Sequence, residues 1–108
     1  MKLNIEPAFS TVSKYEAFFN DGDIKPCSKA TLIVSYRADD RPVGIIEDVW
    51  THEDYRKRGL ATSLIKRLLE LSKEHNCYKV ILDCADHNVS FYKKIGFKIW
   101  QNSMRIDI

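Results

Sequence analysis

The feature that most constrains how this chain can fold is a short basic loop that joins a strand pattern to a helix pattern. Residues 43–51 are apolar and rich in β-branched side chains, which is typical of a strand. Farther on, apolar or small residues recur every three or four positions, the spacing of a helix with one buried face: Leu60, Ala61, Leu64, Ile65, Leu68, Leu69 and Ser72. Between the two patterns lies Arg56-Lys57-Arg58-Gly59. The chain is therefore expected to run from a strand through this loop into a helix.

The start of that helix is a candidate anion-binding site. The first backbone N–H groups of a helix lack intrahelical partners and lie at the positive end of its dipole. Small residues at Gly59 and Ala61 let an anion approach this backbone, and Arg56, Lys57 and Arg58 add positive charge. Neither the Walker phosphate loop nor the three-glycine dinucleotide fingerprint is present. From the loop alone, a solvated basic surface remains the alternative interpretation.

Composition predicts one globular domain over residues 1–108. The chain is 44% hydrophobic and 30% charged, which fits a folded rather than a disordered protein. A formal charge of +2 is too small to indicate a nucleic-acid partner. No apolar run reaches the roughly 20 residues that a membrane helix needs, and no signal peptide is recognised at the start. A cytoplasmic protein without membrane or nucleic-acid partners is expected.

The cysteines and histidines predict neither a disulfide framework nor a metal site. The three cysteines are an odd number without C-x-x-C spacing, and the three histidines lack the spacing of ligands. Cys84 follows an apolar strand pattern, so it is expected to be a small buried residue. His52, at the end of a strand pattern, is expected to be exposed.

The part of the chain before the loop predicts a mixture of short elements. Residues 3–5 are expected to form a strand that ends at Pro7. A helix is expected to begin at Ser10 or Thr11 and to continue through Val12, Tyr15, Phe18 and Phe19. Residues 20–23 should end it. Residues 30–37 and 43–51 then predict a hairpin with its turn at 38–42.

The part after the loop predicts a crossover and a closing hairpin. The long helix should end near Asn76, and residues 78–84 predict a strand. Strand, helix and strand in this order imply a right-handed crossover and a parallel strand pair. A short helix over 88–95 should end at Gly96, followed by strands at 97–100 and 104–108. The predicted class is α/β.

Three motifs within residues 44–97 carry a resemblance to a known family. Arg56-x-x-Gly59-x-Ala61 is similar to the pyrophosphate-binding motif of the GNAT superfamily of acetyl-CoA-dependent N-acetyltransferases. Asn88-x-x-Phe91-Tyr92-x-x-x-Gly96-Phe97 is common in the same enzymes. More narrowly, Ile46-Glu47-Asp48-Val49 together with Asn76-Cys77-Tyr78-Lys79 and Leu82-Asp83-Cys84 resembles eukaryotic-type glucosamine-6-phosphate N-acetyltransferase.

The resemblance implies a fold and a co-substrate. It implies an abbreviated GNAT fold (α/β, also classed α+β), with a mixed, mostly antiparallel sheet, a splayed parallel strand pair and flanking helices, to which residues 1–30 match poorly. Acetyl-CoA would place its pyrophosphate on the basic loop and its pantetheine arm in the splayed gap. The residues expected to contact it are Val49, Trp50, Thr51, Arg56, Lys57, Arg58, Gly59, Leu60, Ala61, Asn88 and Tyr92. No metal is implied.

The resemblance also implies how acetyl transfer would proceed. The amine would attack the thioester directly, without a covalent acyl-enzyme, and a backbone N–H near Val49 or Trp50 would stabilise the oxyanion. Tyr92 would donate a proton to the departing thiolate; packing of the short helix is the alternative role for this side chain. Asp83 and Glu47 are candidate bases.

The acceptor amine is expected to meet acidic side chains. The candidates for binding the amine are Glu47, Asp48 and Asp83. Near the C-terminus, Arg105 is the candidate for binding a phosphate group of the acceptor. Glu47 and Asp48 alternate on one strand, so without a local bulge only one of them can face the site. A hydrogen-bonded carboxylate at a strand end is the alternative role for each acidic residue.

The short turn at 38–42 and the unmatched first 30 residues keep other functions open. One is a GNAT enzyme that acts on a polyamine, an amino acid, a protein N-terminus or a lysine. Another is an acyl-CoA-binding module without turnover. Family members that use the sugar phosphate pair or exchange their C-terminal strands, so a homodimer through residues 104–108 is also expected.

Overall fold

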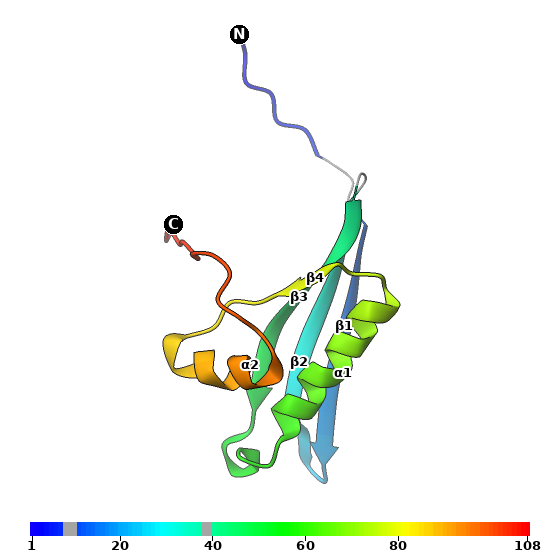
Figure 1. The fold of residues 1–108 in the computed structure, drawn as a ribbon, viewed down its shortest axis with the longest axis vertical. Coiled ribbons are helices and arrows are strands. Elements are labelled where there is room, and N and C mark those ends of the chain that lie inside the picture. Colours follow the sequence, from blue (N-terminus) through cyan, green and yellow to red (C-terminus); the bar gives the residue numbers. More distant parts are fainter. Residues whose placement is uncertain (8–10, 38–39) are drawn as a thin grey trace.

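The computed structural model describes residues 1–7, 11–37 and 40–108, and within them the chain forms a four-stranded mixed sheet in the order β1-β2-β3-β4 (Figure 1). Three long antiparallel strands come first: β1 (Thr11–Asp21), β2 (Ile24–Arg37) and β3 (Asp40–Thr51). The fourth, β4 (Lys79–Ile81), is parallel to β3. The predicted fold class, including the parallel strand pair, is confirmed.

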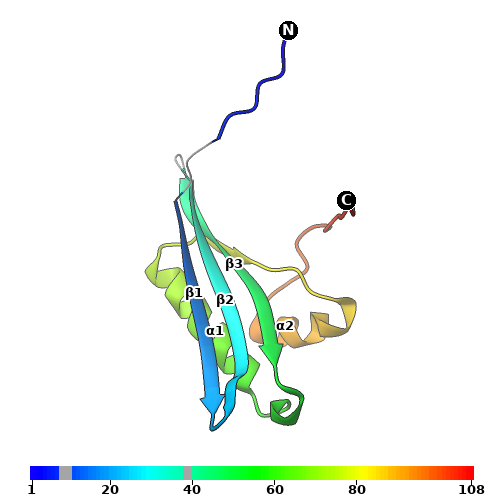
Figure 2. The same cartoon turned by 180° about the vertical axis from the view of Figure 1, so that it is seen from behind.

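The helices lie on one side of this sheet. The 3-10 turn η1 (Glu53–Tyr55) precedes α1 (Leu60–Glu74), and η2 (Asp86–Asn88) precedes α2 (Val89–Ile95). Helix α1 packs across one face of the sheet, and Figure 2 shows the other face, which carries no helix. As predicted, α1 ends just before Asn76, which takes a left-handed conformation with φ +62°. No helix among the described residues is long and apolar enough to cross a membrane.

The core lies between α1 and the three long strands. Alternate residues of β2 face α1, which buries its own apolar stripe against them; the cluster contains Ala30, Leu32, Val34, Ile46, Leu64, Ile65, Leu68 and Tyr92. Burying each large apolar side chain contributes about 1.5–3 kcal/mol. The interior is tightly packed at Gly44, where an added Cβ would lie 3.1 Å from Val80 Cγ2 on β4 and 3.2 Å from Ser72 Oγ on α1.

The parallel pair opens soon after it forms. Val43, Gly44 and Ile45 pair with Lys79, Val80 and Ile81, after which β4 ends while β3 continues to Thr51. The predicted strand over 78–84 is therefore shorter in the structure. A bulge accompanies the opening: β2 pairs Lys29 with Trp50 but Thr31 with Glu47, and Asp48 has φ +53°.

Two predictions for the N-terminal part are wrong. Residues 3–5 form no strand, and the predicted helix is the strand β1. Its inward side chains follow a period of two, with Tyr15 opposite Leu32 and Ala17 opposite Ala30, whereas Phe18 and Phe19 are exposed. Pairing with β2 across the turn at Gly22, which has φ +54°, overrides the helix-like spacing of the aromatic residues. Ser10 and residues 38–39 lie outside the described residues.

The predicted C-terminal hairpin does not form either. Residues 98–108 leave the body of the molecule in an extended path without any strand pairing, and Ile99, Trp100, Met104, Ile106 and Ile108 are exposed (Figure 1). The only neighbouring sheet edge in the described part of the chain is β4, which has just three residues. The three residues of β4 are too few for the C-terminal segment to pair with as a further antiparallel strand.

Candidate active site

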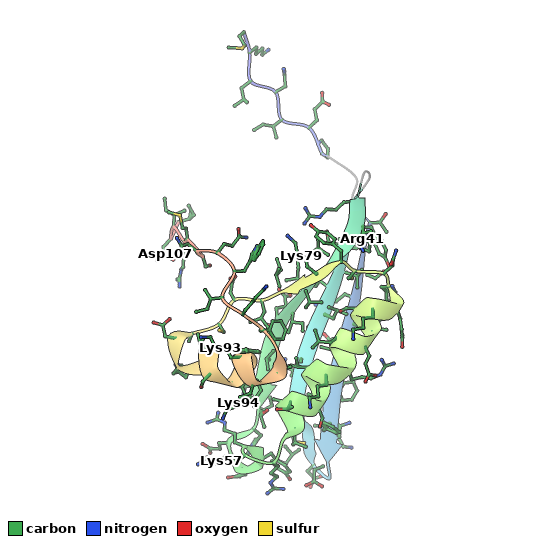
Figure 3. All side chains as sticks on the ribbon, viewed as in Figure 1. Arg41, Lys57, Lys79, Lys93, Lys94 and Asp107 are labelled. Carbon is green, nitrogen blue, oxygen red and sulfur yellow. The ribbon has the colours of Figure 1, made fainter. Side chains whose placement is uncertain are left out.

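The loop before α1 presents bare backbone at the start of a helix. Gly59 is the N-cap residue in a left-handed conformation, φ +78° and ψ +12°, and no side chain caps the helix. The first turn contains no acidic residue. The N–H groups of the first turn, beginning at Leu60 and Ala61, therefore keep the positive end of the helix dipole available to an anion. Lys57 stands on this loop, and Lys93 and Lys94 stand on α2 (Figure 3).

Contacts with the strands hold this loop in place. Tyr55 Oη donates a hydrogen bond to Asp21 Oδ2 at 2.5 Å, which ties η1 to the turn between β1 and β2. The Arg58 guanidinium lies 4.7 Å from the centre of the Tyr55 ring and donates to the Asp54 carbonyl at 3.0 Å. The bond to Asp21 raises the pKa of Tyr55, since it favours the protonated phenol. The loop's cations therefore differ in how they are held. Arg58 is fixed by its contacts with Tyr55 and Asp54, whereas the Lys57 side chain points away from the body of the molecule (Figure 3).

A cleft of about 280 Å³ opens where β3 and β4 part. Three segments that are distant in sequence line it: the part of β3 at the bulge, the chain that follows β4, and the helical turns η2 and α2. The lining residues are Ile46, Glu47, Asp48, Val49, Leu82, Asp83, Cys84, Ala85, Asn88 and Tyr92. The structure therefore brings Glu47, Asp48, Val49, Asp83, Asn88 and Tyr92, all predicted site residues, into one cavity.

The bulge explains why both strand carboxylates border the cleft. In a regular strand Glu47 and Asp48 would point to opposite faces. The left-handed conformation of Asp48, together with the extra residue in β3, breaks this alternation. With Asp83 on the facing wall, the cleft is acidic and suited to a cationic group.

Tyr92 is a buried aromatic residue that lines the cleft. Its side chain is only 8% exposed, and Phe91 and Phe97 pack against its ring edge-on, with centroids at 5.0 and 5.8 Å. Burial raises the pKa of Tyr92, and a smaller Coulombic contribution from Cys84 adds to the rise. The phenol is therefore protonated at neutral pH and can donate a proton or a hydrogen bond into the cleft.

Cys84 corrects one prediction. It was expected to be a buried residue of a strand, but β4 ends before it and Cys84 is exposed on the cleft wall. An early strand end cannot be recognised from the apolar run that precedes it. His52, which was predicted to be exposed, is only 30% exposed and caps η1, since its Nδ1 accepts a hydrogen bond from the Asp54 N–H at 3.2 Å.

Besides the residues of the loop before α1, three predicted site residues lie outside the cleft. The Thr51 carbonyl accepts a hydrogen bond from Arg56 Nε at 3.2 Å, and its hydroxyl lies 2.8 Å from Ser28 Oγ. Trp50 borders a second, shallower hollow. The Arg105 side chain is 85% exposed and pairs with Asp107 at 2.7 Å.

The second hollow adjoins the first. It has a volume of about 550 Å³ and is lined by Lys25, Pro26, Lys29, Asp48, Val49 and Trp50, so it shares Asp48 and Val49 with the cleft. Lys25 and Lys29 were not predicted to belong to any site. Their place at the bulge depends on pairing between β2 and β3. Across the described ranges, no group of His, Cys, Asp or Glu side chains is arranged to hold a metal ion.

Comparison with known proteins places these features in one family. Residues 19–97 match the model of the acetyltransferase (GNAT) family. Glucosamine 6-phosphate N-acetyltransferase of Trypanosoma brucei brucei is 46% identical over 68 residues, which are 63% of this chain and 46% of that relative. The chain thus spans about half the length of this relative.

Two crystal structures have a similar fold. A Trypanosoma brucei acetyltransferase superposes with a TM-score of 0.74 at 39% identity, covering 77% of this chain and 60% of the other. Glucosamine-6-phosphate N-acetyltransferase from Arabidopsis thaliana gives 0.72 at 27% identity, covering 76% and 57%. Both similarities extend over most of this chain.

Proposed function

Because the chain belongs to the acetyltransferase (GNAT) family, we propose that it transfers the acetyl group of acetyl-CoA to a primary amine, and that this amine is glucosamine 6-phosphate. The observation that carries the proposal is the cleft, in which acidic side chains and a buried, protonated tyrosine meet, in a chain that also presents an uncapped helix start. The sugar phosphate is supported by the 46% identity with the trypanosomal glucosamine 6-phosphate N-acetyltransferase.

The described residues suit acetyl-CoA, which would supply a reactive thioester and a pyrophosphate. The N–H groups after Gly59, with Lys57 beside them, offer the pyrophosphate a helix start that no side chain occupies. Beyond Ile45, β3 has no β4 partner, so its backbone groups on that edge can pair with the amides of a pantetheine arm. Asn88, on the opposite wall, offers a side-chain amide to the same arm.

The residues of the cleft can divide the chemistry among them. Glu47, Asp48 and Asp83 attract the acceptor's ammonium group, and one of the carboxylates, directly or through water, takes the proton that must leave before attack. The amine nitrogen then forms its bond to the acetyl carbon as the carbon–sulfur bond breaks. Tyr92 gives its proton to the sulfur, and a backbone N–H near Val49 or Trp50 stabilises the oxygen. Cys84 needs no covalent role in this sequence.

We also propose that two chains associate through their C-terminal segments, and that the enzyme acts in the cytoplasm. Met104, Ile106 and Ile108 alternate as a strand would and are exposed in the single chain. Pairing with the same segment of a second copy would cover them. The molar mass from light scattering, measured with and without residues 104–108, tests the association: loss of a dimer on truncation is expected, and an unchanged mass contradicts it.

The proposed activity is tested by thiol release from acetyl-CoA with glucosamine 6-phosphate, glucosamine or buffer alone. Rapid release that requires the amine is expected, together with a product heavier by one acetyl group. If neither sugar causes release but another amine in a broader panel is acetylated, glucosamine 6-phosphate is not the acceptor and the acetylated amine takes its place in the proposal. Absence of release with every amine would contradict the enzymatic activity itself.

A further inference from the structure

The second hollow lies on the face of the sheet that α1 leaves uncovered. Ala30 belongs to the core beneath α1, so the adjacent Lys29 points to the opposite face. Trp50 is the cross-strand partner of Lys29 and therefore shares that face. Its indole is 42% exposed, and Lys25 lies farther along β2 in the same hollow. An aromatic surface with two lysines beside it thus stands next to the reactive cleft.

The two adjoining hollows differ in charge. The cleft contains Glu47 and Asp83, whereas the second hollow contains Lys25 and Lys29, and Asp48 lies on the wall between them. Among the described residues, neither lysine forms an ion pair, so both ammonium groups are available to a ligand. The molecule therefore presents an anionic and a cationic surface side by side.

The spacing of these surfaces matches a small zwitterion. Lys29 pairs with Trp50 and Thr31 pairs with Glu47, so the lysine and the glutamate are separated by two positions of the ladder. Two strand positions correspond to about 7 Å. A hexose that carries an amine on one side and a phosphate on the other bridges such a distance, and the apolar face of its ring can pack on an exposed indole.

We propose that Lys25, Lys29 and Trp50 form the subsite for the phosphate of the acceptor, with the acceptor's amine held in the adjoining acidic cleft. This inference rests on the proposed function and deepens it, because it names the residues that would bind the phosphate of the acceptor. Other cations are poorly placed for this role. Arg105 pairs with Asp107 outside both hollows, and Arg41 lies at the other end of β3 from Trp50 (Figure 3).

The test compares acceptors in a variant that lacks both charges. Lys25→Gln/Lys29→Gln keeps much of each side chain but removes the ammonium groups, and Lys14→Gln is the matched control, because Lys14 shares the same sheet face opposite Ile33. Thiol release is measured with glucosamine 6-phosphate and with glucosamine. The preference for the phosphorylated sugar in kcat/KM is expected to fall about 100-fold in the double variant and not in the control, since each of the two charge-assisted bonds is worth about a factor of ten.

A second measurement reads the subsite without turnover. With Trp100→Phe, Trp50 is the only tryptophan of the chain. Its fluorescence is expected to change on titration with glucosamine 6-phosphate but not with glucosamine, and 0.5 M salt should weaken the change by screening the exposed charges. Lys25→Gln/Lys29→Gln should abolish it.

The outcomes separate this inference from the proposed function. An unchanged preference in the double variant, an equal loss in Lys14→Gln, or fluorescence that does not depend on the lysines would overturn the phosphate subsite while leaving the acetyltransferase activity intact. A chain that acetylates no amine but shows the lysine-dependent fluorescence change would contradict the proposed activity and support the subsite.

Discussion

The cleft and the loop before α1 are built in opposite ways. The cleft takes its side chains from β3, from the chain after β4 and from α2, and it exists because one strand bulges and its neighbour ends early. The loop is one contiguous segment, and what it offers a ligand is mainly backbone at a glycine with positive φ. One site depends on tertiary assembly, and the other depends on local conformation.

This difference predicts a division of labour. A site that presents acids and a protonated phenol can change the rate of a proton-coupled step. A site that presents backbone N–H groups and cations holds a phosphate without touching the reacting atoms. Substitutions in the cleft are therefore expected to lower kcat, substitutions in the loop should raise the KM for acetyl-CoA, and substitutions in the shared scaffold should affect both.

The largest expected effect is that of Tyr92→Phe in the cleft. The change removes only the hydroxyl, so packing against Phe91 and Phe97 is retained, while the proton donor is lost. We expect kcat to fall about 100-fold or more with little change in the KM for acetyl-CoA. Tyr78→Phe, which alters an exposed tyrosine outside the cleft, is the control. A kcat within twofold of the parent would show that Tyr92 only packs.

The pH dependence of kcat sharpens this assignment. A general acid works in its protonated form, and burial raises the pKa of Tyr92 above its ordinary value of 10.0. As the pH increases, the donor is lost only when the pH passes this raised pKa. The rate should thus persist through the neutral range, with its alkaline decline above pH 10, and Tyr92→Phe should lack that decline. If the alkaline decline of kcat persists in Tyr92→Phe, it reports the titration of a group other than Tyr92.

The shared scaffold is tested by Gly44→Ala. The added Cβ would lie 3.1 Å from Val80 Cγ2 and 3.2 Å from Leu32 Cδ1, beneath the point where β3 and β4 part. Overpacking of this kind costs about 1–3 kcal/mol. We expect a lower free energy of unfolding in urea, a lower kcat and a higher KM for acetyl-CoA. Ser72→Ala, which relieves one of the close contacts by removing Oγ, should recover part of the stability when combined with it; no recovery would contradict the packing role.

The loop is tested by Gly59→Ala. A non-glycine residue with left-handed dihedral angles costs about 1–2 kcal/mol, and the new methyl group stands where an anion would approach the backbone. The KM for acetyl-CoA should rise about tenfold while kcat changes little. Gly22→Ala carries a similar strain at φ +54° in the β1–β2 turn and serves as the control for stability alone. Equal effects of the two substitutions on KM would remove Gly59 from the site.

The smallest effect is expected at the contact that fixes the loop. Tyr55→Phe and Asp21→Ala each remove the 2.5 Å hydrogen bond between η1 and the β1–β2 turn. Because the pair is exposed, each variant should raise the KM for acetyl-CoA only about threefold. The double variant should be no worse than either single variant, since both remove the same bond. Additive effects in this double-mutant cycle would mean that the two residues act independently.

Local features of the sequence could be predicted well. The stripe of α1, the glycine at its start and the asparagine at its end depend on neighbours within a few positions, and the structure confirms the helix and the parallel pair. The helix-like spacing of Val12, Tyr15, Phe18 and Phe19 misled the prediction, because pairing of β1 with β2 decides that segment. Residues 104–108 likewise have an alternating pattern, but no partner strand for them exists among the described residues.

The cleft could be predicted only in part. The motifs indicated Glu47, Asp83, Asn88 and Tyr92, and the structure brings them together. The bulge at Asp48 decides toward which face of the sheet the side chains of β3 point. Because the bulge arises from the pairing of β3 with β2, the residues of β3 alone do not predict it. Lys25 and Lys29 escaped prediction for the same reason, since only the register between β2 and β3 places them beside Trp50.

The most direct test measures thiol release against acetyl-CoA concentration for the parent, Tyr92→Phe and Gly59→Ala, at saturating glucosamine 6-phosphate. Tyr92→Phe is expected to lower the plateau about 100-fold at an unchanged half-saturation, whereas Gly59→Ala should keep the plateau and shift the half-saturation to higher concentration. If both variants lower the plateau and shift the half-saturation in the same proportion, the cleft and the loop do not divide chemistry from binding.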